Sequence, residues 1–300
     1  MQNNNVAKKD IHIAWSNKQD SYSYIATLKA VESLGYNPVV LDMVKLNELS
    51  YVNNLLTPDN KDEHGMLVSS SAQKVKNDWR NSNVKEVAKD VKCIIFPGGS
   101  DISPTLCKKE GSWHGVKDDT EYSAERDVSD YILMSYCIEN DIPMFAICRG
   151  MQMMSVVYGG DIIGDIKLYF ASLNKNDKNI HRDPSKVNFV PHDMKVLSKD
   201  SLLYRVTNKD TLNGVPSWHH QGVKNIEGTG LSVVGETETD GVRIIEALED
   251  KNKTFCLGVQ FHPEVAVKKL VDQEEDRNIF MNYDDGVSFI KYLASITINK

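Results

Sequence analysis

The sequence PMFAICRG, at residues 143–150, combines an apolar run, a cysteine and a glycine. The apolar residues 144–147 are typical of a fully buried strand in a parallel sheet, and residues 150–158 are predicted as a helix. A buried strand that leads directly into a helix is typical of an α/β fold. Cys148 is therefore expected in a tight turn at the carboxyl edge of a sheet.

A thiol in such a turn is held exposed, as serine is in the nucleophile elbow of other hydrolases. The flanking Ala146 and Gly150 are small enough to allow the turn. The dipole and the free N–H groups at the helix N-terminus favour the thiolate form of Cys148. The alternative is one more buried cysteine, because free cysteine packs as a small hydrophobe. This pattern by itself leaves both interpretations open.

The pattern on both sides of this junction extends the α/β order. Strands are predicted at residues 11–15, 38–41, 91–96, 194–197, 231–236, 242–248 and 254–261, and helices at residues 22–34, 123–140 and 286–296. Residues 45–89 are polar and are expected to form an insertion with one helix near its end, and residues 167–182 are expected to form a loop. No repeat or linker divides the chain, so we predict a single domain over residues 10–300 that carries this insertion.

The composition excludes several classes of partner. The 300-residue chain has 41% hydrophobic residues, 26% charged residues and a net charge of -7, so nucleic acid and anionic membrane surfaces are not expected to bind. No apolar stretch is long enough to span a membrane, and residues 1–10 lack the apolar core of a secretory signal. Five cysteines with no C-x-x-C pair favour reduced thiols and a cytoplasmic location.

The sequence QFHPE, at residues 260–264, ends another apolar strand. Residues two apart on an extended strand point to the same side, and Pro263 favours an extended His262. His262 and Glu264 are therefore expected to face one way, as the base and the carboxylate that a cysteine nucleophile needs. Alone, a His-Pro-Glu tripeptide is a weak signal, because most such tripeptides lie in surface turns.

A glycine turn, PGGS at residues 97–100, follows the strand predicted at residues 91–96. Such a turn can present bare backbone N–H groups to a developing oxyanion. A plain turn is the commoner structure for two adjacent glycines, so this motif gains weight only beside the other two.

Together these motifs resemble the class I glutamine amidotransferase-like superfamily and, within it, the γ-glutamyl-γ-aminobutyrate hydrolase branch, the peptidase C26 group. The matching runs are PGGSDISP at residues 97–104, ERD at 125–127, ICRGMQ at 147–152, GGDI at 159–162, SWHHQ at 217–221 and GVQFHPE at 258–264. Their order and spacing hold from about residue 10 to the C-terminus.

The resemblance implies a flavodoxin-like, doubly wound, mostly parallel sheet with helices on both faces, to which the strand-rich second half is added. It implies that Cys148 is the nucleophile, His262 the general base and acid, and Glu264 the residue that orients His262. The oxyanion hole would be formed by the backbone N–H groups of Gly99 and Arg149.

The implied substrate is a small γ-glutamyl amide, hydrolysed without a metal or an organic cofactor. The resemblance suggests that its glutamyl group is bound by Gln152, His220 and Gln221. A homodimer is one of the assemblies that the sequence allows.

Two departures from the family pattern bear on this prediction. The superfamily usually has glycine where this chain has Ala146, which still fits a tight elbow. The branch usually has asparagine where this chain has Pro216, so the substrate is less determined than the chemistry. Two alternatives remain: a glutaminase subunit that delivers ammonia to a partner synthetase, and a catalytically idle binding protein on the same fold.

The remaining candidates have simpler explanations. No cysteine or carboxylate lies at a familiar ligand spacing beside the histidines at 219–220, so we expect them to line a pocket rather than bind a metal. His181 and His192 lie in a loop-rich stretch, where a surface or structural role and an approach to the site are equally compatible with the sequence. Arg126 and Asp127 are expected to form an internal ion pair that braces the edge of the sheet.

Overall fold

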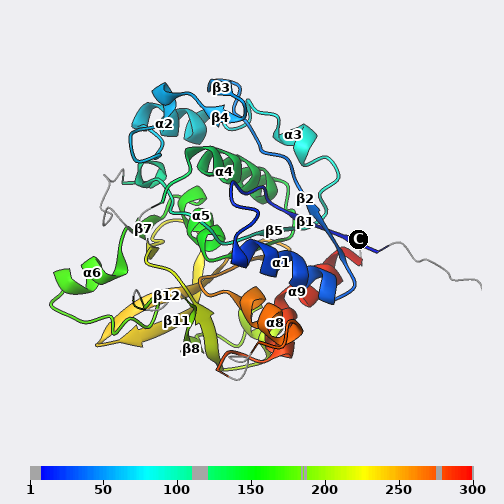
Figure 1. Ribbon diagram of the computed structural model, residues 1–300, viewed down its shortest axis with the longest axis vertical. Helices are drawn as coiled ribbons and strands as arrows, with labels where there is room; N and C mark the ends of the chain where they lie inside the picture. Colours follow the sequence, from blue (N-terminus) through cyan, green and yellow to red (C-terminus); the bar gives the residue numbers. More distant parts are fainter. Residues whose placement is uncertain (1–7, 110–120, 184, 186–187, 275–278, 299–300) are drawn as a thin grey trace, which may run out of the picture.

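The centre of the fold is a parallel sheet made from the predicted apolar runs. A computed structural model describes residues 8–109, 121–183, 185, 188–274 and 279–298 (Figure 1). The parallel strands lie side by side in the order β2 (Asn37–Val40), β1 (Asp10–Ile13), β5 (Ile94–Phe96), β6 (Met144–Ile147) and β13 (Cys256–Val259). All residues of β5, β6 and β13 are buried, which explains their unbroken apolar sequences.

Alternate side chains of these strands face two separate hydrophobic cores. Ile94 and Phe96 belong to one core, with residues of α4 (Ala124–Glu139) and α5 (Arg149–Val157). Ile95 and Phe145 belong to the other, with residues of α1 (Tyr22–Ser33), α8 (Pro263–Val271) and α9 (Tyr283–Ile298). Helices thus cover both faces of the parallel strands, as Figure 1 shows, and the predicted doubly wound α/β fold is confirmed. Within the described ranges, no helix is long and apolar enough to cross a membrane.

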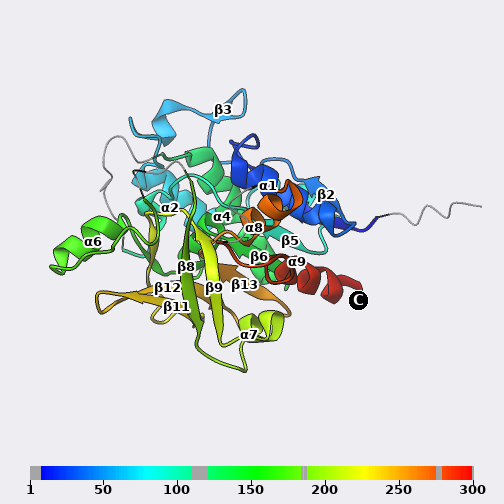
Figure 2. The same ribbon diagram turned by 60° about the horizontal axis from the view of Figure 1, so that its bottom comes forward.

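An antiparallel extension continues the sheet beyond β13. It runs through β12 (Val242–Glu249), β11 (Ser232–Thr239), β8 (Val190–Val196) and β9 (Thr211–Ser217) (Figure 2). In a side branch, β10 (Gly222–Asn225) pairs with β12, and β7 (Asp161–Ile163) pairs with β10. The short helix α7 (Leu202–Thr207) joins β8 to β9. The strand-rich second half is therefore part of the same sheet. Pro216 lies in β9, which ends the sheet path, where a residue without an N–H is tolerated.

The polar residues 45–89 are more ordered than the expected single helix. They form β3 (Tyr51–Val52), β4 (Leu55–Leu56), a 3-10 turn η1 (Pro58–Asn60), α2 (Ser69–Asp78) and α3 (Val84–Val87). Leu46, Leu67 and Val75 are buried in the core that contains α4. Leu46 and Val75 each stand between polar residues, so the sequence shows no clear period although both side chains are buried.

The loop expected at residues 167–182 is also wrong in part, because α6 (Ile166–Ser172) occupies its start. Asp165 caps this helix by accepting a hydrogen bond from the Leu168 N–H at 2.7 Å. Ile166 and Phe170, four residues apart, are buried in a small core against β7 and β12. A capping aspartate followed by this spacing was the signal for a helix.

The packing of α9 on β6 gives a test of the fold. The buried rings of Phe145 and Phe289 stack with centroids 5.1 Å apart. Phe289→Ala should lower the free energy of unfolding by about 3–5 kcal/mol, measured by urea denaturation, because it leaves a cavity between helix and sheet. Leu168→Ala, at a side chain that is 49% exposed, should change it by less than about 0.5 kcal/mol. Equal small losses in both variants would contradict this packing.

Candidate active site

The three chemical motifs meet because they follow neighbouring strands. β6 pairs in parallel with β5 on one side and with β13 on the other. Cys148 follows β6, the glycine turn at residues 97–100 follows β5, and residues 260–264 follow β13. The backbone N–H of Cys148 donates to the Val259 carbonyl at 2.7 Å, which ties the elbow to β13. The carboxyl ends of parallel strands lie at one edge, so this pairing gathers the predicted catalytic residues.

Cys148 is held in a strained backbone conformation. Its φ is +50° and its ψ is -105°, outside the usual regions for a residue with a side chain. It is also the N-cap of α5, and the residue is only 5% exposed. The turn is tight because α5 begins against β5: a Cβ on Gly150 would lie 2.4 Å from the Phe96 carbonyl oxygen. The small residue that the sequence analysis required at this position is therefore sterically necessary.

His262 and Glu264 are in contact, but not for the expected reason. The chain leaves its extended path at Pro263, where α8 begins, so Glu264 lies in the first helical turn rather than on a strand. His262 is the N-cap of α8, and its Nδ1 lies 2.6 Å from Glu264 Oε1. The predicted contact between His262 and Glu264 is therefore present, but a helical turn produces it rather than the alternation of side chains along a strand. Since Nδ1 faces the carboxylate, Nε2 is the nitrogen left for the thiol.

The surroundings of His262 favour its charged form. Burial opposes a positive charge, but the Glu264 carboxylate and the nearby Cys148 sulfur more than offset it and raise the pKa of His262 to about 10. The ring of Phe189 packs edge-on against the imidazole, with centroids 5.1 Å apart. The Cys148 sulfur, the His262 imidazole and the Glu264 carboxylate thus lie in sequence at the sheet edge.

Gln260 is a site residue that the sequence analysis missed. Its Nε2 lies 3.5 Å from Cys148 Sγ, within the range of a hydrogen bond to sulfur. Its Oε1 accepts a hydrogen bond of 3.2 Å from Gln152 Nε2, which also donates to the Gln221 carbonyl at 3.0 Å. Gln260 is completely buried. A polar residue at the end of an otherwise apolar strand, two positions before His262, was the available signal.

The glycine turn lies directly beside Cys148 and His262. A Cβ on Gly98 would lie 2.6 Å from His262 Cε1, and one on Gly99 would lie 1.9 Å from Arg126 Nη1. Both positions therefore require glycine, and the backbone of Gly99 lines the cavity above Cys148. Arg149 is the first residue of α5, so its N–H is one of those that have no acceptor within the helix.

A polar cavity of about 220 Å³ opens above Cys148. The residues predicted to bind substrate, Gln152, His220 and Gln221, all contribute to its lining. Gln221 also supports the wall, because its Oε1 accepts a hydrogen bond from the Ile102 N–H at 3.0 Å.

His220 is held between two carboxylates. Its Nε2 lies 2.8 Å from Asp101 and its Nδ1 lies 3.3 Å from Asp165. Burial opposes a charge on the ring, but hydrogen bonds to these two carboxylates dominate and raise the pKa of His220 to about 9. His220 is therefore charged at neutral pH and fixed between Asp101 and Asp165, whose carboxylates balance its charge.

A second, more apolar cavity of about 410 Å³ adjoins the first. Ser23 and Trp218 line both cavities. Tyr22 and Phe189 complete the aromatic part of the second cavity, and Lys269 and Glu274 contribute the charged part. A bound molecule could thus extend from Cys148 past Trp218 into aromatic surroundings.

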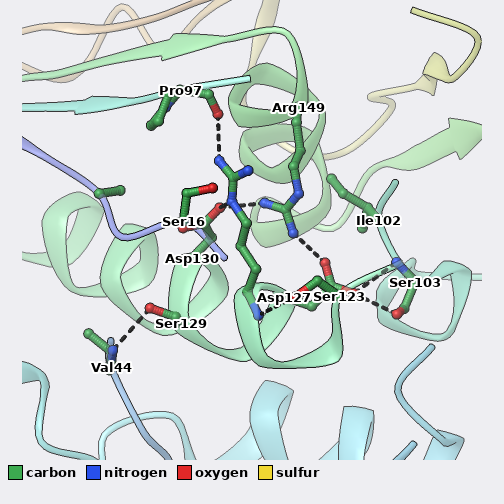
Figure 3. A network of polar contacts seen from close by, with 12 residues as sticks. Ser16, Val44, Pro97, Ile102, Ser103, Ser123, Asp127, Ser129, Asp130 and Arg149 are labelled. Carbon is green, nitrogen blue, oxygen red and sulfur yellow. Dashed lines mark hydrogen bonds and ion pairs between the residues drawn. The ribbon is translucent and has the colours of Figure 1, made fainter. Parts of the chain in front are cut away.

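Beneath the elbow lies a buried network of charges. Arg149 donates to Asp127 Oδ1 at 2.5 Å and to Asp130, and Arg126 pairs with Asp130 at 3.3 Å (Figure 3). Arg126 and Asp127 do not pair with each other as expected: neighbours on α4 point in different directions, and each finds its partner elsewhere. The Asp130 carboxylate, absent from the prediction, balances the second arginine.

This network also holds the loops of the site. Arg126 Nη2 donates to the Pro97 carbonyl at 2.9 Å, and the N–H and hydroxyl of Ser103 donate to Asp127 Oδ2 at 3.0 Å and 2.5 Å. Figure 3 shows these contacts radiating from α4 to both loops and to α5. The glycine turn at residues 97–100 and the elbow at Cys148 are therefore held by the same network of two arginines and two aspartates.

Comparison with known proteins agrees with this geometry. The family model of peptidase C26 matches residues 74–264. The chain belongs to the peptidase C26 family. Its relatives include protein NtpR of Enterococcus hirae, 32% identical over 172 residues, and the γ-glutamyl-γ-aminobutyrate hydrolase PuuD of Escherichia coli K12, 29% identical over 176 residues. Each match covers 57% of this chain, and the chain spans 66% of NtpR and 63% of PuuD.

Solved structures support the fold of this peptidase C26 member. The glutaminase domain of Trypanosoma brucei CTPS with bound acivicin matches with a TM-score of 0.52 at 14% identity, over 98% of this chain and 95% of that one. A glutamine amidotransferase of Thermotoga maritima matches with a TM-score of 0.50 at 12% identity, over 97% of this chain and 99% of that one. The central α/β architecture is thus that of class I glutamine amidotransferase domains.

The buried charges give a prediction about stability. Asp130→Asn keeps the size of the side chain but leaves Arg126 and Arg149 with a single carboxylate, so we expect a loss of about 3–5 kcal/mol in the free energy of unfolding. Urea denaturation measures it, with the exposed Asp59→Asn as the matched control, for which we expect less than about 0.5 kcal/mol. A neutral effect of Asp130→Asn would contradict the role given to the network.

The raised pKa of His262 predicts how stability depends on pH. Because the folded value of about 10 lies above the unfolded value of 6.5, the charged imidazole stabilises the fold fully below about pH 6.5, and this contribution is lost as the pH rises towards about 10. The difference in melting temperature between the wild type and His262→Gln should therefore shrink over this range. His64→Gln, at a partly exposed ring, is the control and should show no such trend. A constant difference for His262→Gln would rule out the charged pair.

Proposed function

We propose that this protein hydrolyses γ-glutamyl amides through a covalent thioester on Cys148. The observation that carries the proposal is the arrangement at the sheet edge, in which Glu264 contacts His262 at 2.6 Å and the Cys148 sulfur lies close enough to His262 to favour its charged form. Such a nucleophile–base–carboxylate arrangement is the group that acyl transfer requires.

In the proposed reaction, the Cys148 sulfur forms a bond to the γ-carbonyl carbon of the substrate. The negative oxygen of the tetrahedral intermediate accepts hydrogen bonds from the N–H groups of Gly99 and Arg149. The carbon–nitrogen bond then breaks, and the amine leaves with the proton of His262. Water attacks the thioester, His262 takes the proton from that water, and glutamate leaves as the thiolate–imidazolium pair is restored.

The polar cavity supports a glutamyl group as the acyl part of the substrate. A γ-glutamyl group carries a carboxylate and an ammonium near the reacting carbonyl, and the cavity lining includes the cations Lys18 and Arg182 as well as the acids Asp101 and Glu121. The charged His220 lies in the same wall. The name of the PuuD relative, a γ-glutamyl-γ-aminobutyrate hydrolase, agrees with this class of substrate.

The adjoining aromatic cavity supports an amine larger than ammonia as the leaving group. Tyr22, Phe189 and Trp218 offer apolar surface and ring faces, on which an alkyl chain or a cationic amine packs favourably. Glutamine, whose leaving group is ammonia, would leave this space unused. The proposal therefore favours hydrolysis of substituted amides over the delivery of ammonia to a partner.

The proposal is tested by amine release, measured by mass spectrometry. Purified protein is incubated with γ-glutamyl-γ-aminobutyrate, γ-glutamyl amides of larger and cationic amines, and glutamine. We expect the substituted amides to react faster than glutamine, and Cys148→Ala to lose at least about a thousandfold in kcat/KM, because only binding and oxyanion contacts remain. Cys137→Ala, at a buried thiol outside the site, is the matched control and should retain activity.

Other outcomes would assign the site differently. Activity retained in Cys148→Ala would exclude the thioester route. Hydrolysis of glutamine alone, stimulated by a partner protein, would favour the glutaminase alternative, and inertness of Cys148 towards iodoacetamide at neutral pH would favour an idle binding protein.

A further inference from the structure

Three histidines and one glutamate outside the catalytic group meet in the interior of the antiparallel half. His181 comes from the loop after α6, His192 from β8, His219 from the turn after β9 and Glu246 from β12. One donor atom from each residue lies within 4.8 Å of all the others. His181 is 1% exposed, His192 9%, His219 4% and Glu246 0%, so this cluster is closed to bulk water.

Hydrogen bonds fix which ring nitrogens face the centre of the cluster. The Nδ1–H of His219 donates to the Gln221 carbonyl at 2.8 Å, and the Nδ1–H of His192 donates to the Asp193 carbonyl at 3.1 Å. Nε2 of both rings therefore carries a lone pair and points inward, where it has no hydrogen-bond partner among the described residues. Backbone carbonyls in this position are the usual second shell of metal-binding histidines.

Nε2 of His192 and Nε2 of His219 are acceptors that lie near the carboxyl oxygens of Glu246. Glu246 Oε1 lies 3.3 Å from His181 Nδ1 and 3.8 Å from His219 Nε2, and Glu246 Oε2 lies 3.9 Å from His192 Nε2. Neither carboxylate oxygen has a hydrogen-bond partner among the described residues. A single proton could bridge only one of these pairs. A cation at the centre would satisfy all four side chains at once, which is the condition for burying them without a large penalty.

We propose that His181, His192, His219 and Glu246 bind one divalent first-row transition-metal ion, with Zn²⁺ as the preferred ion. Imidazole and carboxylate are ligands that suit Zn²⁺, which takes four of them in a tetrahedron. Metal–ligand distances of about 2.0–2.1 Å give a tetrahedral edge of about 3.4 Å. The separation of 3.3 Å between His181 and Glu246 matches this edge. The other two separations from Glu246 are 3.8 Å and 3.9 Å, and all the donor atoms lie within 4.8 Å of one another, so the cluster must contract around the ion.

The electrostatic state of the rings agrees with this role. Burial lowers the pKa of His181 to about 4 and lowers the pKa of His192 and of His219, and it raises the pKa of Glu246 to about 7. Neutral imidazole is the form that binds a metal ion. The sequence analysis expected no metal beside His219 because it found no nearby carboxylate, and the fold supplies one from β12.

The ligand set predicts a structural ion rather than a second reaction centre. Four protein ligands complete a tetrahedron and leave no position for a substrate. The ion would join the loop after α6 to three strands, and through His219 it would fix the Gln221 carbonyl, which accepts from Gln152 in the wall of the active site. A small cavity of about 40 Å³ bordering His181 and His219 offers a way in.

The experiment uses the full chain as Cys148→Ala, so that its result does not depend on hydrolysis. Metal content after purification is measured by plasma mass spectrometry. The protein is then stripped with a chelator and titrated with Co²⁺, whose visible absorption reports tetrahedral coordination. We expect one equivalent of Co²⁺ per chain, displaced by Zn²⁺, and a melting temperature that Zn²⁺ raises in the stripped protein.

Variants identify the ligands. Glu246→Gln and His192→Asn should each weaken Co²⁺ binding by at least tenfold and abolish the effect of Zn²⁺ on the melting temperature, whereas His64→Asn, at a histidine outside the cluster, should retain both. If circular dichroism shows that a variant does not fold, the Co²⁺ titration of the parent protein still tests the proposed metal site. Absence of stoichiometric Co²⁺ binding in the parent, or binding unchanged in both folded cluster variants, would overturn the proposal.

Discussion

Two arginines and two aspartates, buried without access to water, set the geometry on which the rest of the site depends. Arg126, Asp127, Asp130 and Arg149 are each completely buried, and their charges balance. Charges in such a position are tolerated only when their hydrogen-bonding groups meet partners, so the network penalises any displacement of α4, α5 or the loops at Pro97 and Ser103. The network therefore stabilises one arrangement of the loops more than it stabilises the fold in general.

The buried ion network helps to explain how Cys148 keeps its strained backbone conformation. A residue with a positive φ is unfavourable in isolation and persists only where its surroundings determine it. Here the Arg149 side chain fixes α5 from below, β13 holds the Cys148 N–H, and Gln260 contacts the sulfur. The thiol is thus held at a helix N-terminus beside a charged imidazole before any substrate binds, and this preorganisation is what acyl transfer demands.

The sequence predicts the parallel half of the fold and the meeting of Cys148, His262 and Glu264 at one sheet edge because both depend on local signals. Apolar runs mark β5, β6 and β13, and the reactive residues follow these runs directly. The sequence does not predict the features that depend on contacts between residues far apart in the chain. β9 and β10 are strands defined by their neighbours, and the partner of Arg126 depends on the orientation of α4. The contact of Glu264 with His262 was predicted through the wrong geometry, because Pro263 begins a helix as readily as it extends a strand.

A series of hydrogen bonds joins the parallel and the antiparallel half of the sheet. In the antiparallel half, His219 donates to the Gln221 carbonyl, which also accepts from Gln152. Gln152 in turn donates to Gln260, whose Nε2 contacts the Cys148 sulfur. All residues linked by these hydrogen bonds are buried. Water therefore cannot replace a bond that is lost when His219 moves, so the neighbouring groups must move with it. A metal ion on His219 would therefore act on the nucleophile without touching it, by fixing the amide groups between them. On this argument the histidine–glutamate cluster belongs to the same preorganised unit as the ion network beneath the elbow: one restrains the site from the side of α4, the other from the side of the antiparallel strands.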